Sequence, residues 1–473
     1  MTADPSANHT PNHGHATDTP QRLGDEVAAL FKAYDVRGLV PQELNPEVAY
    51  RTGRAVAAFL GAKEVVVGRD MRVSGPSLSG ALIDGLRDQG ANVTDIGLVS
   101  TDTLYFAVGK YGYDAGVMIT ASHNPASYNG FKICREEARA LSMETGIADI
   151  RDLVVSGEYP EPASDTRGDL SERDVLDAYA KHVLSMIDPA RIKPLRIAID
   201  AGNGMAGELV PRVFRNLSCE IVPLYFELDG TFPNHEANPI EPENIRDLQR
   251  TVLERQCDLG VAFDGDADRM FLIDEHGTFI GGDMTTAMVA IQMLKQSPDS
   301  NIVYNLICSR TVPEVIESNG GTAIRSRVGH SFIKALMREQ DAIFGGEHSG
   351  HFYFRDNWYA DSGLIALLTV LQLVSDDGQP LSEILKPIDA RVRSGEINSE
   401  VSDPGATLER VGATYTAEGA EIDHLDGLTV GFDDWWFNLR ASNTQPLLRL
   451  NVEAEDDTVL REKTGDVLAL LRT

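Results

Sequence analysis

The chain has 473 residues, which is enough for about three domains of ordinary size. Hydrophobic residues make up 42% of it and charged residues 24%, as is usual for a protein with a packed core. The formal net charge of −30 argues against nucleic acid and anionic membranes as partners, because both would be repelled. A phosphorylated ligand would need a local cluster of basic side chains in this acidic background.

The sequence lacks the features of a membrane or secreted protein. No apolar run approaches the roughly 18 residues of a membrane-spanning helix, and the best candidate, residues 363–374, predicts a buried helix instead. The N-terminus has no basic region followed by an apolar stretch. The cysteines form no CxxC pair, so neither a zinc site nor a disulfide framework is predicted. We therefore expect a cytoplasmic protein.

In chain order, residues 1 to about 22 come first and predict a disordered tail, because they contain almost no large apolar side chains. Short, uniformly apolar runs then predict strands covered on both faces. These runs are residues 64–67, 115–119, 195–199, 259–263, 302–305 and 342–344. Helical patterns fall between them, at residues 81–89, 175–186, 244–255, 284–295 and 331–338.

This alternation predicts right-handed βαβ units and parallel sheets. The last part of the chain differs, because several strand patterns there precede one helix and so predict a separate α+β domain. The strands are expected at residues 428–430, 436–439 and 447–452, and the helix at 457–471. Segments rich in Pro, Gly, Ser and Asp mark candidate domain boundaries at residues 156–169, 274–277 and 387–396.

The loops that follow the strands are the candidate site, because ligands bind at the carboxyl ends of parallel strands. Residues 120–125 (TASHNP) place Ser122 directly after a strand, where it is a candidate nucleophile. A serine that caps the next turn is the alternative. His123 is poorly placed as a base for Ser122, since neighbouring side chains on an extended chain point apart.

The loop at residues 264–269 (DGDADR) carries three carboxylates at alternate positions, Asp264, Asp266 and Asp268. They would repel one another without a cation, and oxygen ligands favour a hard ion such as Mg²⁺. An EF-hand is excluded because Arg269 stands where that motif needs glycine. A solvated acidic turn is the alternative.

Two further loops carry polar groups suited to a phosphorylated sugar. Residues 345–351 (GGEHSGH) present Glu347, Ser349 and His351, which can bind several hydroxyls at once; a polar strand face is the alternative. Residues 440–446 (RASNTQP) combine one guanidinium with hydroxyls and an amide, as in an anion cradle. An ordinary polar turn is the alternative.

Together these loops resemble those of the α-D-phosphohexomutase superfamily, in particular its bacterial phosphomannomutase/phosphoglucomutase branch. In chain order they are similar to the family's phosphoserine, metal, sugar-binding and phosphate-binding loops. Residues 34–38 (YDVRG) resemble the opening motif, and residues 232–235 (FPNH) with 238–239 (NP) resemble a signature of the second domain. The resemblance extends from about residue 31 to the C-terminus.

The resemblance implies an α/β fold of three similar domains with mixed or parallel sheets, and a C-terminal TBP-like α+β domain, around a central cleft. The expected parts are a disordered tail (1–23) and four domains (24–163, 164–277, 278–388 and 389–473). They carry the phosphoserine, metal, sugar-binding and phosphate-binding loops, respectively.

The implied activity is the interconversion of mannose 6-phosphate and mannose 1-phosphate, with glucose phosphates as possible further substrates. It would proceed through a phosphoserine and a hexose 1,6-bisphosphate intermediate that also serves as activator. Mg²⁺ is the implied cofactor, small-molecule hexose phosphates are the implied ligands, and a monomer or homodimer is expected. Phosphoglucomutase and phosphoglucosamine mutase are the alternatives.

The resemblance also assigns roles to individual residues. The implied catalytic residues are Ser122, His123, Lys132, Arg37, Arg269 and His330, with Lys132 and His330 as the candidate bases. The implied substrate ligands are Tyr34, Glu347, Ser349, His351, Arg440, Ser442, Asn443 and Thr444. The implied metal ligands are Asp264, Asp266, Asp268 and Ser122. Many relatives carry a lysine where Ile307 stands here, and Arg310 is the candidate to replace it.

Two other classes of function compete with a mutase. Residues 202–207 (GNGMAG) follow a strand and match G-x-G-x-x-G, with Glu220 downstream as a ribose ligand, which would fit an NAD-dependent oxidoreductase. A tight turn is the alternative, and the resemblance favours it. A non-catalytic sugar-phosphate-binding protein would bind the same ligands but never carry phosphate on Ser122.

Overall fold

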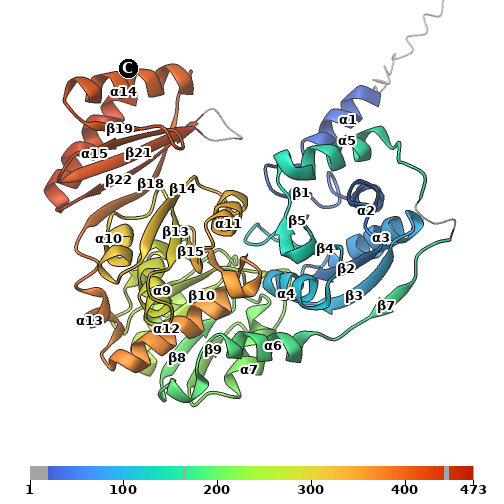
Figure 1. Cartoon of the computed structure of the whole chain (residues 1–473), viewed down its shortest axis with the longest axis horizontal. Coiled ribbons are helices and arrows are strands. Elements are labelled where there is room, and N and C mark those ends of the chain that lie inside the picture. The colour runs from blue at the N-terminus through green and yellow to red at the C-terminus, as the bar shows by residue number, and fades with distance from the viewer. Residues whose placement is uncertain (1–19, 163–165, 442–446, 472–473) are drawn as a thin grey trace, which may run out of the picture.

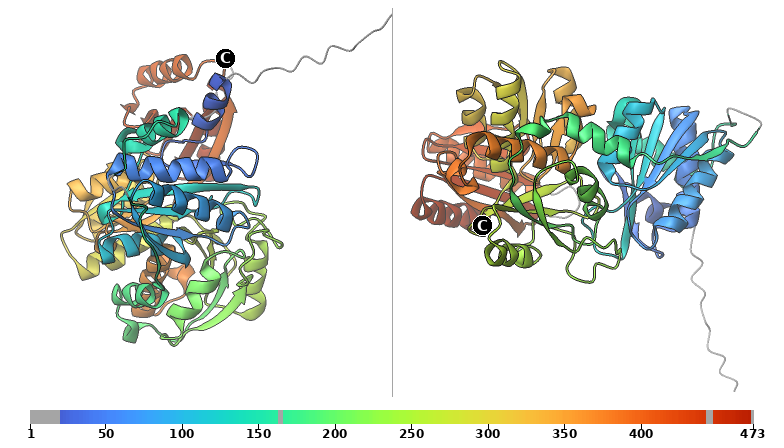
Figure 2. Two further views of the ribbon diagram at one scale, coloured as in Figure 1. Left: turned by 90° about the vertical axis from the view of Figure 1, so that its right-hand side faces the viewer. Right: turned by 90° about the horizontal axis from the view of Figure 1, so that it is seen from below.

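The computed structural model describes residues 20–162, 166–441 and 447–471. Four sheets follow one another along an arc, with the N-terminal unit at one end and the C-terminal unit at the other (Figures 1 and 2). Helix α1 (Pro20–Ala28) begins inside the segment whose composition predicts a tail. Residues 1–19 lie outside the described part of the chain.

The first sheet has the order β1-β5-β4-β2-β3-β7, with β6 paired to β5. Its strands are β1 (Val36–Leu39), β2 (Glu64–Arg69), β3 (Asn92–Leu98), β4 (Ala115–Ile119), β5 (Tyr128–Arg135), β6 (Arg139–Ala140) and β7 (Leu170–Glu172). The helices of this unit are α2 (Pro46–Leu60), α3 (Gly75–Asp88), α4 (Thr101–Tyr111) and α5 (Ala148–Ser156).

The second sheet has the order β12-β11-β10-β8-β9. Its strands are β8 (Arg196–Asp200), β9 (Glu220–Leu224), β10 (Leu259–Phe263), β11 (Met270–Ile273) and β12 (Phe279–Ile280). The helices here are α6 (Leu176–Ser185), α7 (Ala206–Phe214) and α8 (Arg246–Arg255).

The third sheet has the order β14-β13-β15-β16-β17. Its strands are β13 (Asn301–Asn305), β14 (Thr322–Ser326), β15 (Phe344–Gly346), β16 (Phe352–Phe354) and β17 (Ala360–Asp361). The helices are α9 (Gly282–Gln296), α10 (Thr311–Ser318), α11 (His330–Glu339), α12 (Gly363–Asp377) and α13 (Leu381–Leu385).

The fourth sheet is antiparallel throughout, in the order β18-β22-β21-β20-β19. Its strands are β18 (Val392–Glu400), β19 (Glu421–Asp423), β20 (Leu428–Gly431), β21 (Trp435–Ala441) and β22 (Leu447–Ala454). Helices α14 (Pro404–Ala417) and α15 (Asp457–Leu471) complete this unit. The expected α/β class, with a C-terminal α+β unit, is confirmed.

The first three sheets are mixed rather than purely parallel, and they share one antiparallel feature. In each sheet one parallel strand is followed by a short turn and a strand that returns beside it: β4 by β5, β10 by β11 and β15 by β16. The turns between these strands hold the phosphoserine-like, metal-like and sugar-like loops. Each candidate loop is therefore held at both ends by paired strands.

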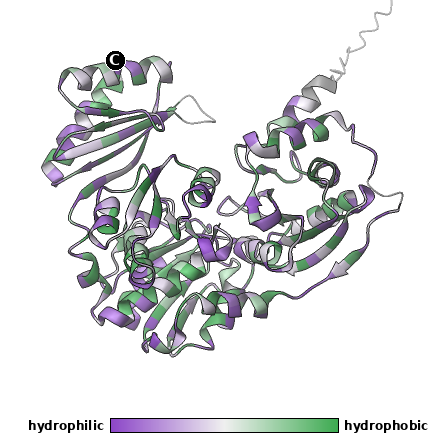
Figure 3. Ribbon diagram, in the orientation of Figure 1, coloured by the Kyte–Doolittle hydropathy of each residue, from purple (hydrophilic) through white to green (hydrophobic). Residues whose placement is uncertain are grey.

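The second and third units share a hydrophobic core, whereas the C-terminal unit has a core of its own. One hydrophobic cluster joins the second and third units, with Ile199 and Val261 on one side and Met284 and Ile365 on the other. The C-terminal sheet has a separate cluster that includes Phe437 and Leu450. The helices around the sheets carry both green and purple residues in Figure 3, as expected of elements with one buried face. The C-terminal unit thus has its own core.

Helix α12 confirms the prediction of a buried apolar helix, because its residues from Gly363 to Ser375 are all buried. No helix in the described ranges combines the length and the hydropathy that crossing a membrane requires.

A buried carboxylate links the first three units. Asp102, near the start of α4, accepts hydrogen bonds from Ser100, from Tyr179 on α6 and from Ser362 at the start of α12, the last at 2.7 Å. Burial raises the pKa of Asp102 to about 6, although the hydroxyl donors favour the ionised form. Each donor therefore offsets part of the cost of burying this group.

Tyr179→Phe should destabilise the protein by about 1 to 3 kcal/mol, because it removes one donor from a buried carboxylate. We expect a lower melting temperature by calorimetry, with Tyr113→Phe, at a buried tyrosine outside this junction, as the control. Equal melting temperatures for both variants would contradict the role of the junction.

Candidate active site

Ser122 lies in the turn after β4 with its backbone in the left-handed region, at a φ of 49°. Its Oγ is 2.7 Å from Asp264 Oδ2 and 3.2 Å from His123 Nδ1. The expectation that Ser122 and His123 point apart is therefore wrong, because the chain is turned rather than extended at Ser122. Burial, with Arg269 and Arg37 nearby, holds the pKa of His123 well below its usual range, so its ring is neutral.

A buried arginine that sequence reasoning missed fixes this loop. Arg72 is 1% exposed and donates to the carbonyl oxygen of Ser122 at 2.8 Å. The same guanidinium donates to the carbonyls of Asn124, Pro125 and Tyr128. Because Arg72 precedes Ser122 by 50 residues, nothing in the local pattern of either segment predicts the contact.

The phosphoserine-like loop and the acidic loop approach each other backbone to backbone. A Cβ at Gly265 would lie 2.6 Å from the carbonyl oxygen of Ser122, so only glycine fits at this position. Thr101, at the start of α4, also reaches the acidic loop, with its hydroxyl 2.6 Å from Asp266 Oδ2. The start of a helix favours a negative group there.

The carboxylates of Asp264, Asp266 and Asp268 converge, with one oxygen from each lying within 4.8 Å of the others. All three residues are buried, and Asp266 Oδ1 and Asp268 Oδ1 have no hydrogen-bond partner in the described structure. Burial, together with the carboxylate of Asp266, raises the pKa of Asp268. Unpartnered oxygens in a crowded acidic site fit the ligand set of a divalent cation such as Mg²⁺.

Basic side chains surround this acidic cluster. Lys132 Nζ lies 2.8 Å from Asp266 Oδ2 and also contacts Asp268. Burial opposes its charge, but the two carboxylates outweigh burial and raise the pKa of Lys132 well above its usual range. Arg269 Nε lies 2.9 Å from Asp264 Oδ2, and Arg37 donates to the carbonyl of Ala121 and to Asn124. The local basic cluster expected of a phosphate site is therefore present.

The sugar-like loop faces the acidic loop across the second and third units. Glu347 is 2% exposed and accepts from Asn305 Nδ2 at 3.2 Å and from the Tyr353 hydroxyl. His351 Nδ1 lies 3.0 Å from Asp361 Oδ2; since a carboxylate only accepts, this nitrogen carries the proton. Asp361, which the sequence did not single out, thus fixes the orientation of the His351 ring.

Tyr34 and His330 lie together, with ring centroids 4.8 Å apart in an edge-on arrangement. Gly329 allows this contact, because a Cβ there would lie 2.4 Å from the Tyr34 hydroxyl. Burial, reinforced by Lys334, holds the pKa of His330 well below its usual range. The His330 imidazole is therefore neutral and able to accept a proton.

Arg440 of the C-terminal unit stands directly opposite Arg449 in the β21–β22 pair. Both guanidinium groups lie near Glu396 of β18, at 3.4 and 3.3 Å. Arg449 was not predicted, although it is a second cation beside the cradle-like turn. Ser442, Asn443 and Thr444 lie outside the described residues.

Family profiles cover most of this arrangement. The profiles of phosphoglucomutase/phosphomannomutase alpha/beta/alpha domains I, II and III match residues 28–159, 177–277 and 281–390, and that of the C-terminal domain matches residues 396–469. The chain belongs to the α-D-phosphohexomutase superfamily.

Individual proteins of the superfamily resemble the chain over nearly its whole length. A phosphomannomutase of Salmonella montevideo is 42% identical over 450 residues, 94% of this chain and 99% of that protein. Phosphohexose mutases of Xanthomonas campestris are 43% identical over 447 residues, 93% of this chain and 99% of that protein. The crystal structure of a Burkholderia thailandensis phosphoglucomutase/phosphomannomutase family protein, 34% identical, superposes with a TM-score of 0.87 and covers 94% of this chain and 97% of that one.

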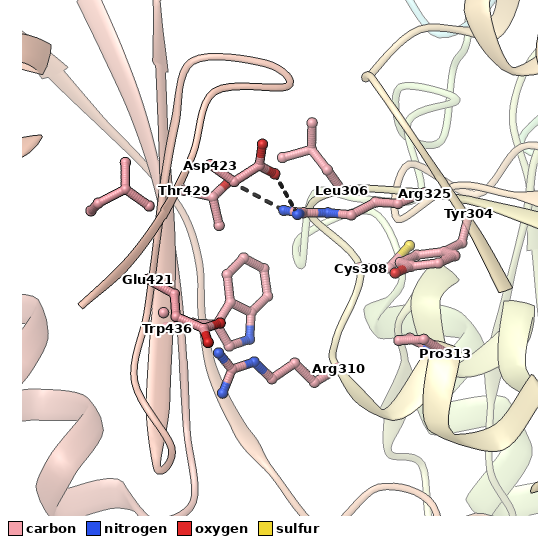
Figure 4. A pocket seen from close by; sticks show the side chains of 12 residues that line it. Tyr304, Leu306, Cys308, Arg310, Pro313, Arg325, Glu421, Asp423, Thr429 and Trp436 are labelled. Carbon is pink, nitrogen blue, oxygen red and sulfur yellow. Dashed lines mark hydrogen bonds and ion pairs between the residues drawn. The ribbon is translucent and has the colours of Figure 1, made fainter. Parts of the chain in front are cut away.

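Arg310 does not point into the phosphohexomutase site. Its guanidinium donates to the carbonyl of Phe432 at 2.6 Å, and its backbone N–H donates to Glu453 Oε1. Figure 4 shows Arg310 and Arg325 extending from the third unit toward the C-terminal sheet, where Arg325 binds Asp423. Arg310 therefore holds the two units together and does not take the place of a basic side chain at Ile307.

The glycines of residues 202–207 serve packing. A Cβ at Gly204 would lie 2.6 Å from the carbonyl of Gly265, and one at Gly207 would lie 2.1 Å from that of Phe226. The FPNH segment covers the same turn, since His235 Nε2 lies 3.0 Å from Asp200 Oδ2. The turn supports the acidic loop, which favours the structural interpretation over a dinucleotide site.

Gly265→Ala should destabilise the protein by about 1 to 3 kcal/mol, since the new methyl group would force two backbone segments apart. We expect a lower melting temperature by calorimetry. The control is Gly80→Ala in α3, where a Cβ meets nothing within 4 Å and helix propensity favours alanine. A Gly265→Ala protein as stable as Gly80→Ala would contradict the close approach of the loops.

Proposed function

We propose that the chain interconverts mannose 6-phosphate and mannose 1-phosphate, using Ser122 as the carrier of the phosphoryl group. The observation that carries this proposal is the position of the Ser122 hydroxyl, 2.7 Å from a carboxylate of the buried acidic cluster. Whole-length similarity to proteins named phosphomannomutase supports the choice of sugar. Glucose phosphates are the alternative substrate pair.

A single nucleophile requires the sugar to be bound in two orientations, because O1 and O6 of a hexose lie at opposite ends of the molecule. Phosphorylated Ser122 first transfers its phosphoryl group to the free hydroxyl: the Ser122 Oγ–P bond breaks and a sugar O–P bond forms. The resulting 1,6-bisphosphate turns end for end. Ser122 Oγ then attacks the other phosphate, which restores phosphoserine and releases the isomeric monophosphate.

The basic side chains around Ser122 balance the charge of this transfer. Asp264, Asp266 and Asp268 would hold a divalent cation, which when bound would supply Lewis-acid stabilisation of the phosphoryl group. Lys132 and Arg269 form ion pairs with these carboxylates and so add positive charge beside Ser122. The neutral imidazole of His330 is the acceptor that we assign to the proton of the sugar hydroxyl.

The remaining residues hold the sugar in both orientations. Glu347, Ser349 and His351 present polar atoms from one loop, where they would bind hydroxyls common to both poses. Arg440 and Arg449 bind the phosphate that is not being transferred, and Ser442, Asn443 and Thr444 are assigned to the same cradle from the sequence. The Arg440 side chain is 16% exposed, so a phosphate there would be largely withdrawn from water.

Ser122→Ala should abolish turnover of mannose 1-phosphate, because no other hydroxyl occupies its place beside Asp264. We expect binding of the substrate, measured by calorimetry, to change by less than about threefold, since Ser122 contributes to transfer rather than to grip. A variant with wild-type turnover would contradict the mechanism.

Asp268→Asn should weaken Mg²⁺ binding by about tenfold or more, because it removes one anionic ligand from the cation. Isothermal titration of Mg²⁺ into the protein measures this directly, without reference to turnover. Asp274→Asn is the matched control, since Asp274 follows β11 at the other end of the same hairpin and accepts backbone N–H bonds from His276 and Thr278. Equal Mg²⁺ affinity in the two variants would exclude the acidic cluster as the metal site.

A further inference from the structure

A histidine of the sugar-binding loop, His348, lies where the third unit meets the C-terminal unit. Glu347 bonds to Asn305 and Tyr353 inside the third unit, whereas His348 directs Nδ1 at Asp283 of α9, with 3.9 Å between Nδ1 and Oδ2. The His348 side chain is 34% exposed, but its Nδ1 atom is buried and has no hydrogen-bond partner in the described structure.

A second cation reaches the same carboxylate oxygen from the C-terminal unit. Arg393, on the strand that leads into that unit, places Nε 3.7 Å from Asp283 Oδ2. Asp283 is 1% exposed, and Ser309 N–H lies 3.4 Å from the same oxygen. One buried carboxylate is therefore shared by a histidine of the sugar-binding loop and an arginine of β18.

The contact borders a small cavity of about 20 Å³, which is the size of roughly one water molecule. Ile307 and His348 line it from the third unit, and Arg393, Asn451 and Glu453 line it from the C-terminal unit. Arg393 Nη1, Asn451 Nδ2 and Glu453 Oε2 are buried there without a hydrogen-bond partner in the part of the chain that the structure describes. Together with His348 Nδ1, buried polar atoms of both units thus meet at this point without a hydrogen-bond partner among the described residues.

Strand β18 connects this contact to the phosphate-binding residues. Glu396, three residues after Arg393, lies 3.4 Å from Arg440 and 3.3 Å from Arg449. The C-terminal sheet has its own hydrophobic core, so polar contacts place it against the third unit: those of β18 at Arg393, and those of Arg310 and Arg325 described above. A shift of β18 at Arg393 would move Arg440 relative to the sugar-binding loop.

We propose that His348 is a positioning residue. Through Asp283 and Arg393 it fixes the position of the phosphate-binding arginines of the C-terminal unit relative to the sugar-binding loop. The inference rests on the proposed function, because it concerns how one hexose phosphate is gripped at both ends. In this proposal His348 acts through Asp283 and Arg393 and has no assigned contact with the sugar or the phosphate.

The charge on His348 makes this role dependent on pH. Burial opposes the imidazolium, but Asp283 outweighs burial and raises the pKa of His348 above its usual 6.5; Arg393 lowers it and Glu396 raises it. The other ionisable groups at this point are Cys308, Glu453 and Asp389, whose Oδ1 lies 2.6 Å from Arg393 Nη2. Because the pKa is raised, the ion pair is complete at lower pH and is lost as the pH rises through that value.

The test measures binding of mannose 1-phosphate by calorimetry in a Ser122→Ala background, where no turnover occurs. The range from about pH 7 to about pH 9 is suitable, since the second pKa of a phosphate monoester lies near 6 and the ligand is already a dianion. Affinity should fall about threefold to fivefold across this range, the size expected of a partly exposed ion pair. With His348→Gln, affinity should stay at the weaker value at every pH.

The matched control is His276→Gln, because His276 is an exposed histidine on a distant loop. It should follow the pH dependence of the parent. His348→Gln and Arg393→Gln should also be non-additive, the double variant binding no more weakly than the weaker single variant. Arg393→Lys replaces Arg393→Gln in this cycle if the latter does not fold.

Coinciding pH curves for the parent and His348→Gln, or additive effects of His348 and Arg393, would overturn the inference and leave the proposed function standing. If the Ser122→Ala parent binds neither mannose 1-phosphate nor glucose 1-phosphate, the proposed function fails, and this inference fails with it.

Discussion

The burial of three carboxylates beside one serine is the constraint on which the rest of the site depends. Asp264, Asp266 and Asp268 are withdrawn from water within 4.8 Å of one another, an arrangement that is costly unless cations accompany it. The chain supplies part of that charge through Lys132 and Arg269, and the unpartnered oxygens are ligands that a divalent cation would take. Despite a net charge of −30, basic side chains therefore lie where the proposed phosphoryl transfer takes place.

Rigidity at this point comes from the way the loops are supported. Each of the first three candidate loops is the turn between two paired strands, so its ends are fixed by the sheet. Arg72 donates hydrogen bonds to four carbonyl oxygens in and near the Ser122 loop. Gly265, which has no side chain, allows the backbone of the acidic loop to lie against that of Ser122. The C-terminal unit has its own core and meets the third unit through polar contacts such as those of Arg310 with Phe432 and Arg325 with Asp423.

The sequence predicted the local features and missed those that depend on distant contacts. Ser122 and the aspartates were recognisable because glycine, charge and a preceding apolar strand lie within a few residues. The returning strand β5 was missed, since its polar and glycine residues do not resemble a buried strand. Arg72 and Thr101 were missed because their partners lie 50 and 165 residues away, which no local pattern records.

The account stands on Ser122 as the carrier of the phosphoryl group, and ³¹P NMR of the wild-type protein tests that most directly. The protein would be incubated with Mg²⁺, a trace of hexose 1,6-bisphosphate and mannose 1-phosphate. The account predicts a growing signal of the 6-phosphate, a phosphoserine resonance and no inorganic phosphate. Release of inorganic phosphate alone, or no change while Ser122 is phosphorylated, would contradict it.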